Sequence, residues 1–256
     1  MTRDRTRFFA ILMPWGRVGS NLVTMALAAS ENIEIDNEPA TRLSTSGHQE
    51  GWSKEMIGAR QLEHLSSFHE AHRDAGGAAG LKLSHRSLIA PRDYAECLIE
   101  LDFLPIIMLR NNFLKCAVSQ MRALARVEAL RRQRPNWRSP WAVGRTEPKP
   151  GPTTIDPTEA IRLTQVFEKH HLALLETSRA AFTRDTIQIE YRQLASNPGA
   201  TIERLFRALD LSPPKRIRVP HKKATSDLLS QDITNYTEFA EAVHRAGLGH
   251  FLAADS

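Results

Sequence analysis

The stretch Phe8–Ala28, FFAILMPWGRVGSNLVTMALA, decides the fold expected for this chain. Its first part, Phe8–Met13, is an apolar run with the length of a buried strand. A glycine-containing turn over residues 14–19 follows, and after it come Ser20 and Asn21, which are residues favoured at a helix N-cap. Backbone N–H groups of such a turn, together with the helix dipole, point at an anion. The stretch therefore predicts a phosphate-binding loop in an α/β protein.

The turn matches neither of the two common phosphate-binding motifs. A Walker A loop has a lysine directly after its second glycine, where this chain has Ser20. A GxGxxG loop has one residue between its first two glycines, whereas two residues separate Gly16 from Gly19. The cation of the turn, Arg17, lies inside it. An ordinary strand-to-helix turn with a solvated arginine accounts for the loop equally well, so the rest of the chain must decide.

The composition is that of a soluble globular protein. Of 256 residues, 41% are hydrophobic and 25% are charged, which is enough apolar material for a substantial core. We expect a single domain over residues 1–256. The formal charge of +5 suits an anionic ligand but is small for a dedicated nucleic-acid binder, so no nucleic-acid partner is expected.

Three further features of the sequence restrict the class of protein to which it can belong. Cys97 and Cys116 have no CxxC or framework spacing and are expected to be reduced thiols. The ten histidines form no metal-binding pattern, so no metal is expected. The charged start of the chain has no signal-peptide character, and no apolar run approaches the length of a membrane span. We expect a cytoplasmic protein without an integral membrane segment.

Charged side chains follow the expected strands at the points where these strands end. Three further strands are expected over residues 32–36, 81–85 and 103–109. Glu38 follows the first of them, His85 ends the second and Arg110 follows the third. In an open parallel sheet these positions share one edge, the edge at which ligands bind. An exposed glutamate before a proline and a surface arginine at a strand end are the plainer interpretations of Glu38 and Arg110.

Three stretches outside these strands carry weaker signals. Residues 41–50 are polar and predict a loop, whereas residues 56–72 and 157–182 show helical spacing. Pro105 is unfavourable inside a central strand, so we expect the strand proper to begin at Ile106.

Arg110 and Ser119 give the sequence its sharpest resemblance. A strand, then Arg110, then eight residues, then Ser119 in a helix resembles the 3′-phosphate motif of sulfotransferases that use 3′-phosphoadenosine 5′-phosphosulfate (PAPS). The turn Arg17–Ser20 likewise resembles the 5′-phosphosulfate loop of that family. The spacing from Arg110 to Ser119 is similar to that of bacterial carbohydrate sulfotransferases, such as those acting on trehalose and on nodulation factors. The resemblance implies an α/β, three-layer P-loop-like fold with a central parallel sheet flanked by helices.

The resemblance also implies roles for individual residues. Arg17 occupies the position of the basic loop residue and would both bind the cofactor and act in catalysis. Glu38 is the first candidate for the general base and His85 the second, by its similarity to the strand-exit histidine of cytosolic members. The remaining residues implied to bind PAPS are Val18, Gly19, Ser20, Asn21, Arg110, Ser119, Tyr191, Lys222 and Lys223. Where the family has an acidic residue after the tyrosine, this chain has Arg192.

The implied activity is transfer of a sulfuryl group from PAPS to a hydroxyl acceptor. By resemblance the acceptor is a carbohydrate or glycolipid, with a small aliphatic or phenolic alcohol as the runner-up, and a homodimer is compatible with the sequence. Two alternatives stay open: a P-loop nucleotide kinase or other NTPase, and a non-catalytic protein that binds adenosine 3′,5′-bisphosphate (PAP) or a sulfated ligand. The arginine-rich stretch 122–145 is either a solvated helix end or a wall that attracts the anionic cofactor or an acidic acceptor. In the Pro- and Gly-rich stretch 135–157, Trp137 and Trp141 either stack on a sugar ring or hold the loop to the core.

Overall fold

The computed structural model describes residues 6–133, 143–144, 146, 148–182, 186–214, 221–222, 225–226 and 228–253. Contacts divide the chain into two compact units. Unit 1 comprises Met1–Leu109 with His170–Arg218, and unit 2 comprises Arg110–Lys169 with Val219–Ser256. The single domain expected over residues 1–256 stays a prediction.

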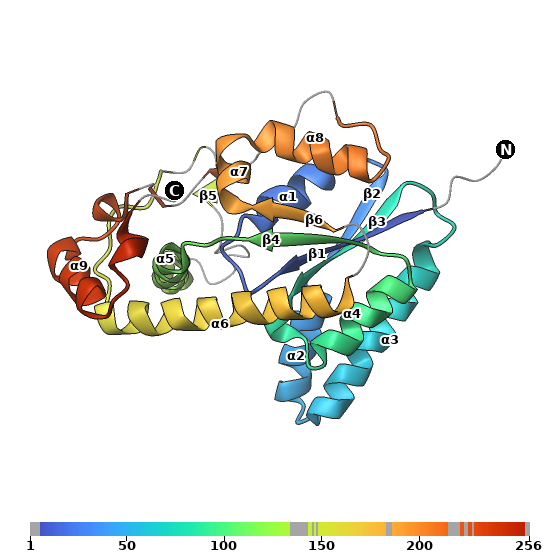
Figure 1. The fold of residues 1–256 in the computed structure, drawn as a ribbon, viewed down its shortest axis with the longest axis horizontal. Helices are drawn as coiled ribbons and strands as arrows, with labels where there is room; N and C mark the ends of the chain where they lie inside the picture. Colours follow the sequence, from blue (N-terminus) through green and yellow to red (C-terminus); the bar gives the residue numbers. More distant parts are fainter. Residues whose placement is uncertain are drawn as a thin grey trace. The chain divides into compact units, whose positions relative to one another are not determined.

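Unit 1 contains a five-stranded parallel sheet (Figure 1). In the order in which they lie, its strands are β2 (Ile33–Asn37), β3 (Ala78–Ser84), β1 (Arg7–Met13), β4 (Leu104–Leu109) and β6 (Ile187–Glu190). Every pair of neighbours is parallel, so the carboxyl ends of all five strands lie at one edge. The stretch that decides the fold supplies the central strand β1 and the helix after it.

Helices cover both faces of this sheet (Figure 1). One face packs against α1 (Ser20–Leu27), α7 (Tyr191–Ser196) and α8 (Pro198–Ala208). The other packs against α2 (Pro39–Gln49), α3 (Lys54–His72), α4 (Pro91–Glu100) and the unit 1 part of α6 (Pro157–Ala181). Alternation along β1 divides the two cores, since Phe9, Ile11 and Met13 join the first and Phe8, Ala10 and Leu12 the second. The expected three-layer α/β fold with a central parallel sheet is confirmed.

Unit 2 is built around the long helix α5 (Phe113–Gln133). Its other described elements are β5 (Val143–Gly144), the start of α6, β7 (His221–Lys222), η2 (Leu229–Gln231), α9 (Tyr236–Arg245) and η3 (Gly249–Leu252). Leu114 and Val118 of α5 pack in one apolar core with Phe239 and Val243 of α9. Arg122 of α5 forms a buried ion pair with Asp232 and donates a hydrogen bond to the Gly151 carbonyl oxygen at 2.8 Å. This ion pair joins three chain segments that are far apart in sequence.

Two expectations about local structure are wrong. Residues 41–50 are not a loop: they lie almost entirely within α2, which begins at Pro39, a residue well suited to the first helical position. The polar side chains of α2 hide the helical period, and the buried Gly47 is where the helix packs closely on Ile57. Strand β4 begins at Leu104 and so includes Pro105. Because β6 pairs with β4 only from Ile106 onwards, Pro105 lies where the ladder is one-sided.

Candidate active site

The helix after the loop begins at Ser20, and its N-cap is Gly19 rather than Ser20 or Asn21. Gly19 has φ of 83°, the left-handed region that favours glycine. The Ser20 hydroxyl donates to the Met13 Sδ atom at 3.1 Å instead of capping the helix. The first N–H groups of a helix have no partner within it, and among the described residues no hydrogen bond involves those of Ser20 and Asn21. The loop therefore presents N–H donors, as an anion site requires.

Gly19 also lies against the segment that follows β6. A Cβ atom at this position would lie 2.7 Å from the Leu194 Cδ2 atom and 3.3 Å from the Tyr191 Cδ2 atom. The structure thus brings Tyr191, the first residue of α7, to the loop. The side chain of Val18 is buried in the core beneath α1 and α8 and anchors the loop.

Arg17 and Glu38 share an unusual backbone conformation. They have φ of 66° and 53° and are two of four non-glycine residues with positive φ in the described part of the chain. Such conformations cost about 1–3 kcal/mol each, persist only where the surroundings fix them, and cluster at functional sites. Next to Arg17, the Trp15 ring packs under the Arg86 guanidinium, with 4.0 Å from Arg86 Cζ to the ring centroid.

Glu38 follows β2 and lies in a polar network with β3 and α1. The Lys82 ammonium is 2.8 Å from the Glu38 Oε1 atom and donates a hydrogen bond to the Asn21 Oδ1 atom at 2.6 Å. Asn21 is the second residue of α1. One ammonium group therefore links the glutamate after β2 to the helix of the anion loop. Among the residues predicted from the sequence, Glu38 and Asn21 are brought together in this way.

Lys82 is the residue that sequence reasoning missed. It lies within β3, is 4% exposed, and was assigned no role. The sequence did indicate a partner for Lys82, because a lysine inside the apolar strand AAGLKLS is rarely buried without a charged or polar group beside it.

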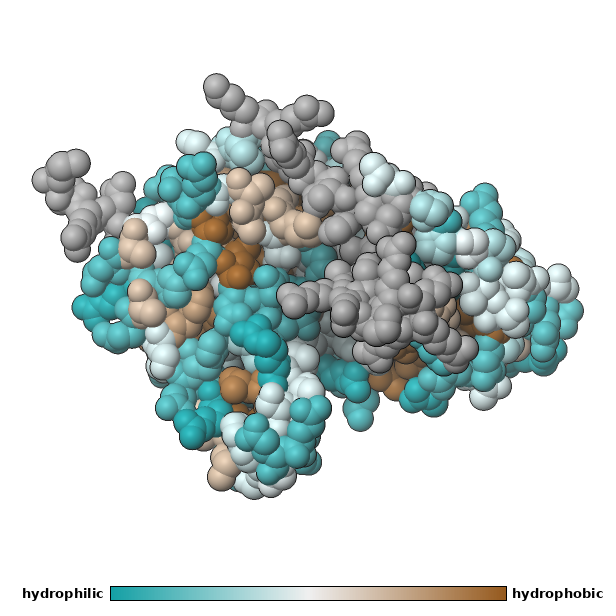
Figure 2. All heavy atoms as spheres, turned by 180° about the vertical axis from the view of Figure 1, so that it is seen from behind, coloured by the Kyte–Doolittle hydropathy of each residue, from teal (hydrophilic) through white to brown (hydrophobic). Residues whose placement is uncertain are grey.

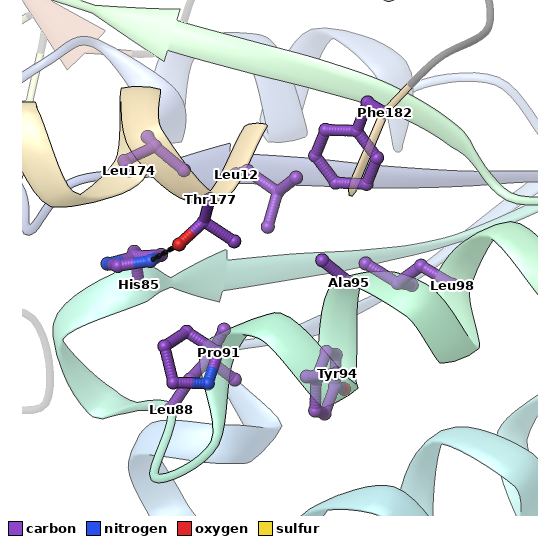
Figure 3. Close-up of a pocket in the computed structure, with 10 residues that line it drawn as sticks. All are labelled: Leu12, His85, Leu88, Pro91, Tyr94, Ala95, Leu98, Leu174, Thr177 and Phe182. Carbon is purple, nitrogen blue, oxygen red and sulfur yellow. Dashed lines mark hydrogen bonds between the residues drawn. The ribbon is translucent and has the colours of Figure 1, made fainter. Parts of the chain in front are cut away.

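His85 follows β3 and faces an apolar region of unit 1. Its Nε2 atom is 2.9 Å from the Thr177 Oγ1 atom of α6. Figure 3 shows this contact beside Leu12, Leu88 and Tyr94, which line the same apolar pocket. Burial, followed by the nearby charge of His170, lowers the pKa of His85 to about 4. At neutral pH the imidazole is uncharged and one of its nitrogens is engaged.

Unit 2 holds the other predicted cofactor residues. Arg110, directly after β4, and Ser119, two turns into α5, are 6% and 5% exposed. Lys115 and Arg122 are also buried and share a face of α5 with Ser119, because residues 115, 119 and 122 follow helical spacing. Burial of this many cations in one unit is uncommon. Lys222 lies in β7, its side chain is not described, and Lys223 lies outside the described residues.

Three further observations concern the whole described part of the chain. No three His, Cys, Asp or Glu side chains there come together as ligands of a metal ion would. None of its helices is both long enough and apolar enough to cross a membrane. On the face drawn in Figure 2, hydrophobic residues form small scattered spots among hydrophilic ones.

Comparison with known proteins gives structural likeness only. No protein-family model matches the chain, and no curated protein sequence matches it. Among solved structures, a sulfotransferase from Alicyclobacillus acidocaldarius is similar, with 16% identity, a TM-score of 0.45 and 96% of each chain covered. The sulfotransferase domain of the olefin synthase from Synechococcus PCC 7002 has 12% identity and a TM-score of 0.43, with 93% of this chain and 85% of that chain covered.

Proposed function

We propose that this protein is a sulfotransferase that transfers a sulfuryl group from PAPS to a hydroxyl group of a carbohydrate or glycolipid. One observation carries the proposal: a carboxylate, Glu38, is tied through Lys82 to the first turn of the helix that follows an anion-binding loop. Sulfuryl transfer needs both an anion site for the donor and a base for the acceptor hydroxyl. An anion loop alone would serve a non-catalytic binding protein equally well.

The residues present fit PAPS. The loop offers N–H donors at Ser20 and Asn21, and Gly19 lets the loop pack against Leu194 and Tyr191. PAPS carries phosphate at both the 3′ and the 5′ position of its ribose and so needs cations at a second place; the buried Arg110 with Ser119 is a donor set of this chemistry. PAPS supplies the sulfuryl group and a 5′-phosphate leaving group that is already a stable anion.

The chain's own residues then have separate roles. Glu38 would accept the proton of the acceptor hydroxyl at its carboxylate. The loop N–H groups and the permanent charge of Arg17 would stabilise negative charge that develops at the 5′ end of the donor. His85 is less suited to be the base, because a histidine with a pKa of about 4 has little affinity for a proton at neutral pH and its Nε2 atom is already engaged.

The nature of the acceptor rests on the resemblance to bacterial carbohydrate sulfotransferases. A small aliphatic or phenolic alcohol is the second candidate. We further propose that the protein acts in the cytoplasm.

Two measurements test the function. Calorimetry should give a lower Kd for PAP than for AMP or for ATP with Mg²⁺. PAP release from PAPS should then be followed over trehalose, a chitin oligosaccharide, an alkyl glucoside, hexanol and 2-naphthol. Binding of PAP without turnover on any acceptor would favour the non-catalytic protein, and preference for ATP with Mg²⁺ would favour a nucleotide kinase or NTPase.

A further inference from the structure

Lys82 holds Glu38 at two points. The Glu38 backbone N–H donates to the Lys82 carbonyl oxygen at 2.8 Å, and the Glu38 Oε1 atom lies 2.8 Å from the Lys82 Nζ atom. The backbone of Glu38 is in the left-handed region, with φ of 53° and ψ of 48°. Non-glycine residues rarely stay in this conformation unless their neighbours fix them. Lys82 is the neighbour that contacts both the main chain and the side chain of Glu38.

The Lys82 side chain lies on the sheet face that α1 covers. Lys82 is paired in register with Ile11 of β1, which belongs to the core under α1. From there the ammonium reaches the Asn21 Oδ1 atom at 2.6 Å. The ammonium is almost fully buried, so it cannot exchange these two oxygen partners for water at low cost. The geometry fixes the distance between the Glu38 carboxylate and the first turn of α1.

The ion pair occupies only one carboxylate oxygen. The other, Oε2, is 3.4 Å from the Thr41 Oγ1 atom, and that hydroxyl has a shorter contact of 2.9 Å to the Ser87 Oγ atom. A hydroxyl has one proton to donate, and the shorter contact, to Ser87, is the stronger hydrogen bond of the two. Oε2 is therefore the oxygen with capacity to accept a proton from a further hydroxyl.

We infer that Lys82 is a positioning residue, which fixes Oε1 of Glu38 so that Oε2 faces the acceptor hydroxyl at a set distance from the anion loop. This inference rests on the proposed function. Lys82 acts here through Glu38 rather than on the substrate. A buried ion pair is by itself weak evidence for a role in stability, since an apolar pair of similar volume is often as stable.

A double-mutant cycle separates this role from others. The variants are Lys82→Met, Glu38→Gln and the two combined. The matched control is Ser84→Ala, two residues further along β3, because Ser84 is also buried and its Oγ atom has no hydrogen-bond partner among the described residues. Each variant is assayed for kcat and for the KM of PAPS with the acceptor that turns over, and for thermal unfolding without ligand.

Lys82→Met should lower kcat about 10- to 100-fold, by more than it raises the KM of PAPS. In the Glu38→Gln background the same substitution should change kcat less than about twofold, because the group that Lys82 positions is already disabled. The unfolding temperatures should show the same dependence: the decrease caused by Lys82→Met should be smaller in the Glu38→Gln protein. Ser84→Ala should resemble the wild type in kcat.

The outcomes are distinct. An equal loss of kcat in both backgrounds, or a loss confined to KM, overturns the inference and leaves the proposed function standing. A wild type that releases no PAP with any acceptor overturns the proposed function and this inference with it. If Lys82→Met does not fold, Lys82→Gln, which keeps a donor but no charge, takes its place in the cycle.

Discussion

Gly19 lies directly against Leu194: a Cβ atom at position 19 would meet the Leu194 Cδ2 atom at 2.7 Å. The same residue has φ of 83°. Both conditions require glycine, one for reasons of space and one for reasons of backbone conformation. The loop before α1 is thereby fixed to the segment that follows β6.

Gly19→Ala should destabilise the fold by about 2–4 kcal/mol, which combines the cost of a left-handed alanine with overpacking against Leu194. For a chain of this size this lowers the unfolding temperature by about 5–15 °C, and PAP binding should weaken as well. Gly16→Ala is the control, because nothing lies within 4 Å of a Cβ atom there. Equal unfolding temperatures for the two variants would contradict the steric argument.

Arg17→Ala should lower kcat about 10²- to 10³-fold while PAP affinity changes far less, since its charge is most useful when negative charge develops in the transition state. Arg86→Ala is the control: it removes another arginine that contacts the same loop through Trp15. Steady-state kinetics and calorimetry give the two quantities. A change in KM alone would make Arg17 a binding residue.

Glu38→Gln should lower kcat about 10²- to 10⁴-fold with PAP affinity nearly unchanged, because the amide cannot accept a proton. His85→Asn should cost less than about tenfold, since its imidazole lies in an apolar region and contacts Thr177. The reverse order of the two variants would assign the base to His85.

Stability below pH 6.5 should depend on His85. Burial lowers its pKa to about 4 in the folded chain, whereas the unfolded chain binds a proton near pH 6.5. Between these values the unfolded state holds more protons, so the contribution of His85 is present above pH 6.5 and is lost as the pH falls towards 4. The loss is at most about 3.5 kcal/mol, at roughly 1.4 kcal/mol per pKa unit. Denaturant unfolding of wild type and His85→Asn over this range measures it; parallel curves would contradict it.

Arg110→Ala should raise the Kd of PAP about 10- to 100-fold and leave that of AMP nearly unchanged, because a charge-assisted contact to phosphate contributes roughly 1.5–3 kcal/mol. Arg162→Ala removes an exposed arginine of unit 2 and serves as the control. Calorimetry with both nucleotides decides; a similar loss for PAP and AMP would remove the assignment of Arg110 to the 3′-phosphate.

The regular elements of unit 1 could be predicted because their signals are local. The apolar run Phe8–Met13 and the helical spacing of residues 56–72 need no partner to be recognised, and both elements formed as expected. The start of β4 and the helix α2 could not be predicted in this way. Whether Pro105 is tolerated depends on where β6 begins to pair, and the polar residues of α2 hide its period.

The positions of the candidate residues at the strand ends could be predicted from the sequence, but their contacts could not. Parallel strands place Glu38 and His85 at the ends of β2 and β3 by topology alone. That Lys82 binds Glu38 depends on the register Asn37↔Lys82 between β2 and β3, which spacing along the chain does not specify. That His85 faces an apolar region depends on Leu174 and Thr177 of α6, which are about ninety residues away in sequence.

Each of the two compact units is assembled from two separated lengths of chain. During synthesis the ribosome releases the first four strands of the sheet well before β6, and Arg122 well before its partner Asp232. Neither unit can be completed until the chain beyond position 190, for unit 1, or 232, for unit 2, has emerged. Each unit therefore waits for its second length of chain, and until that length emerges the apolar surface awaiting it is exposed to other proteins. Fragments that end at Leu109 or at Lys169 should therefore fail to fold into either unit.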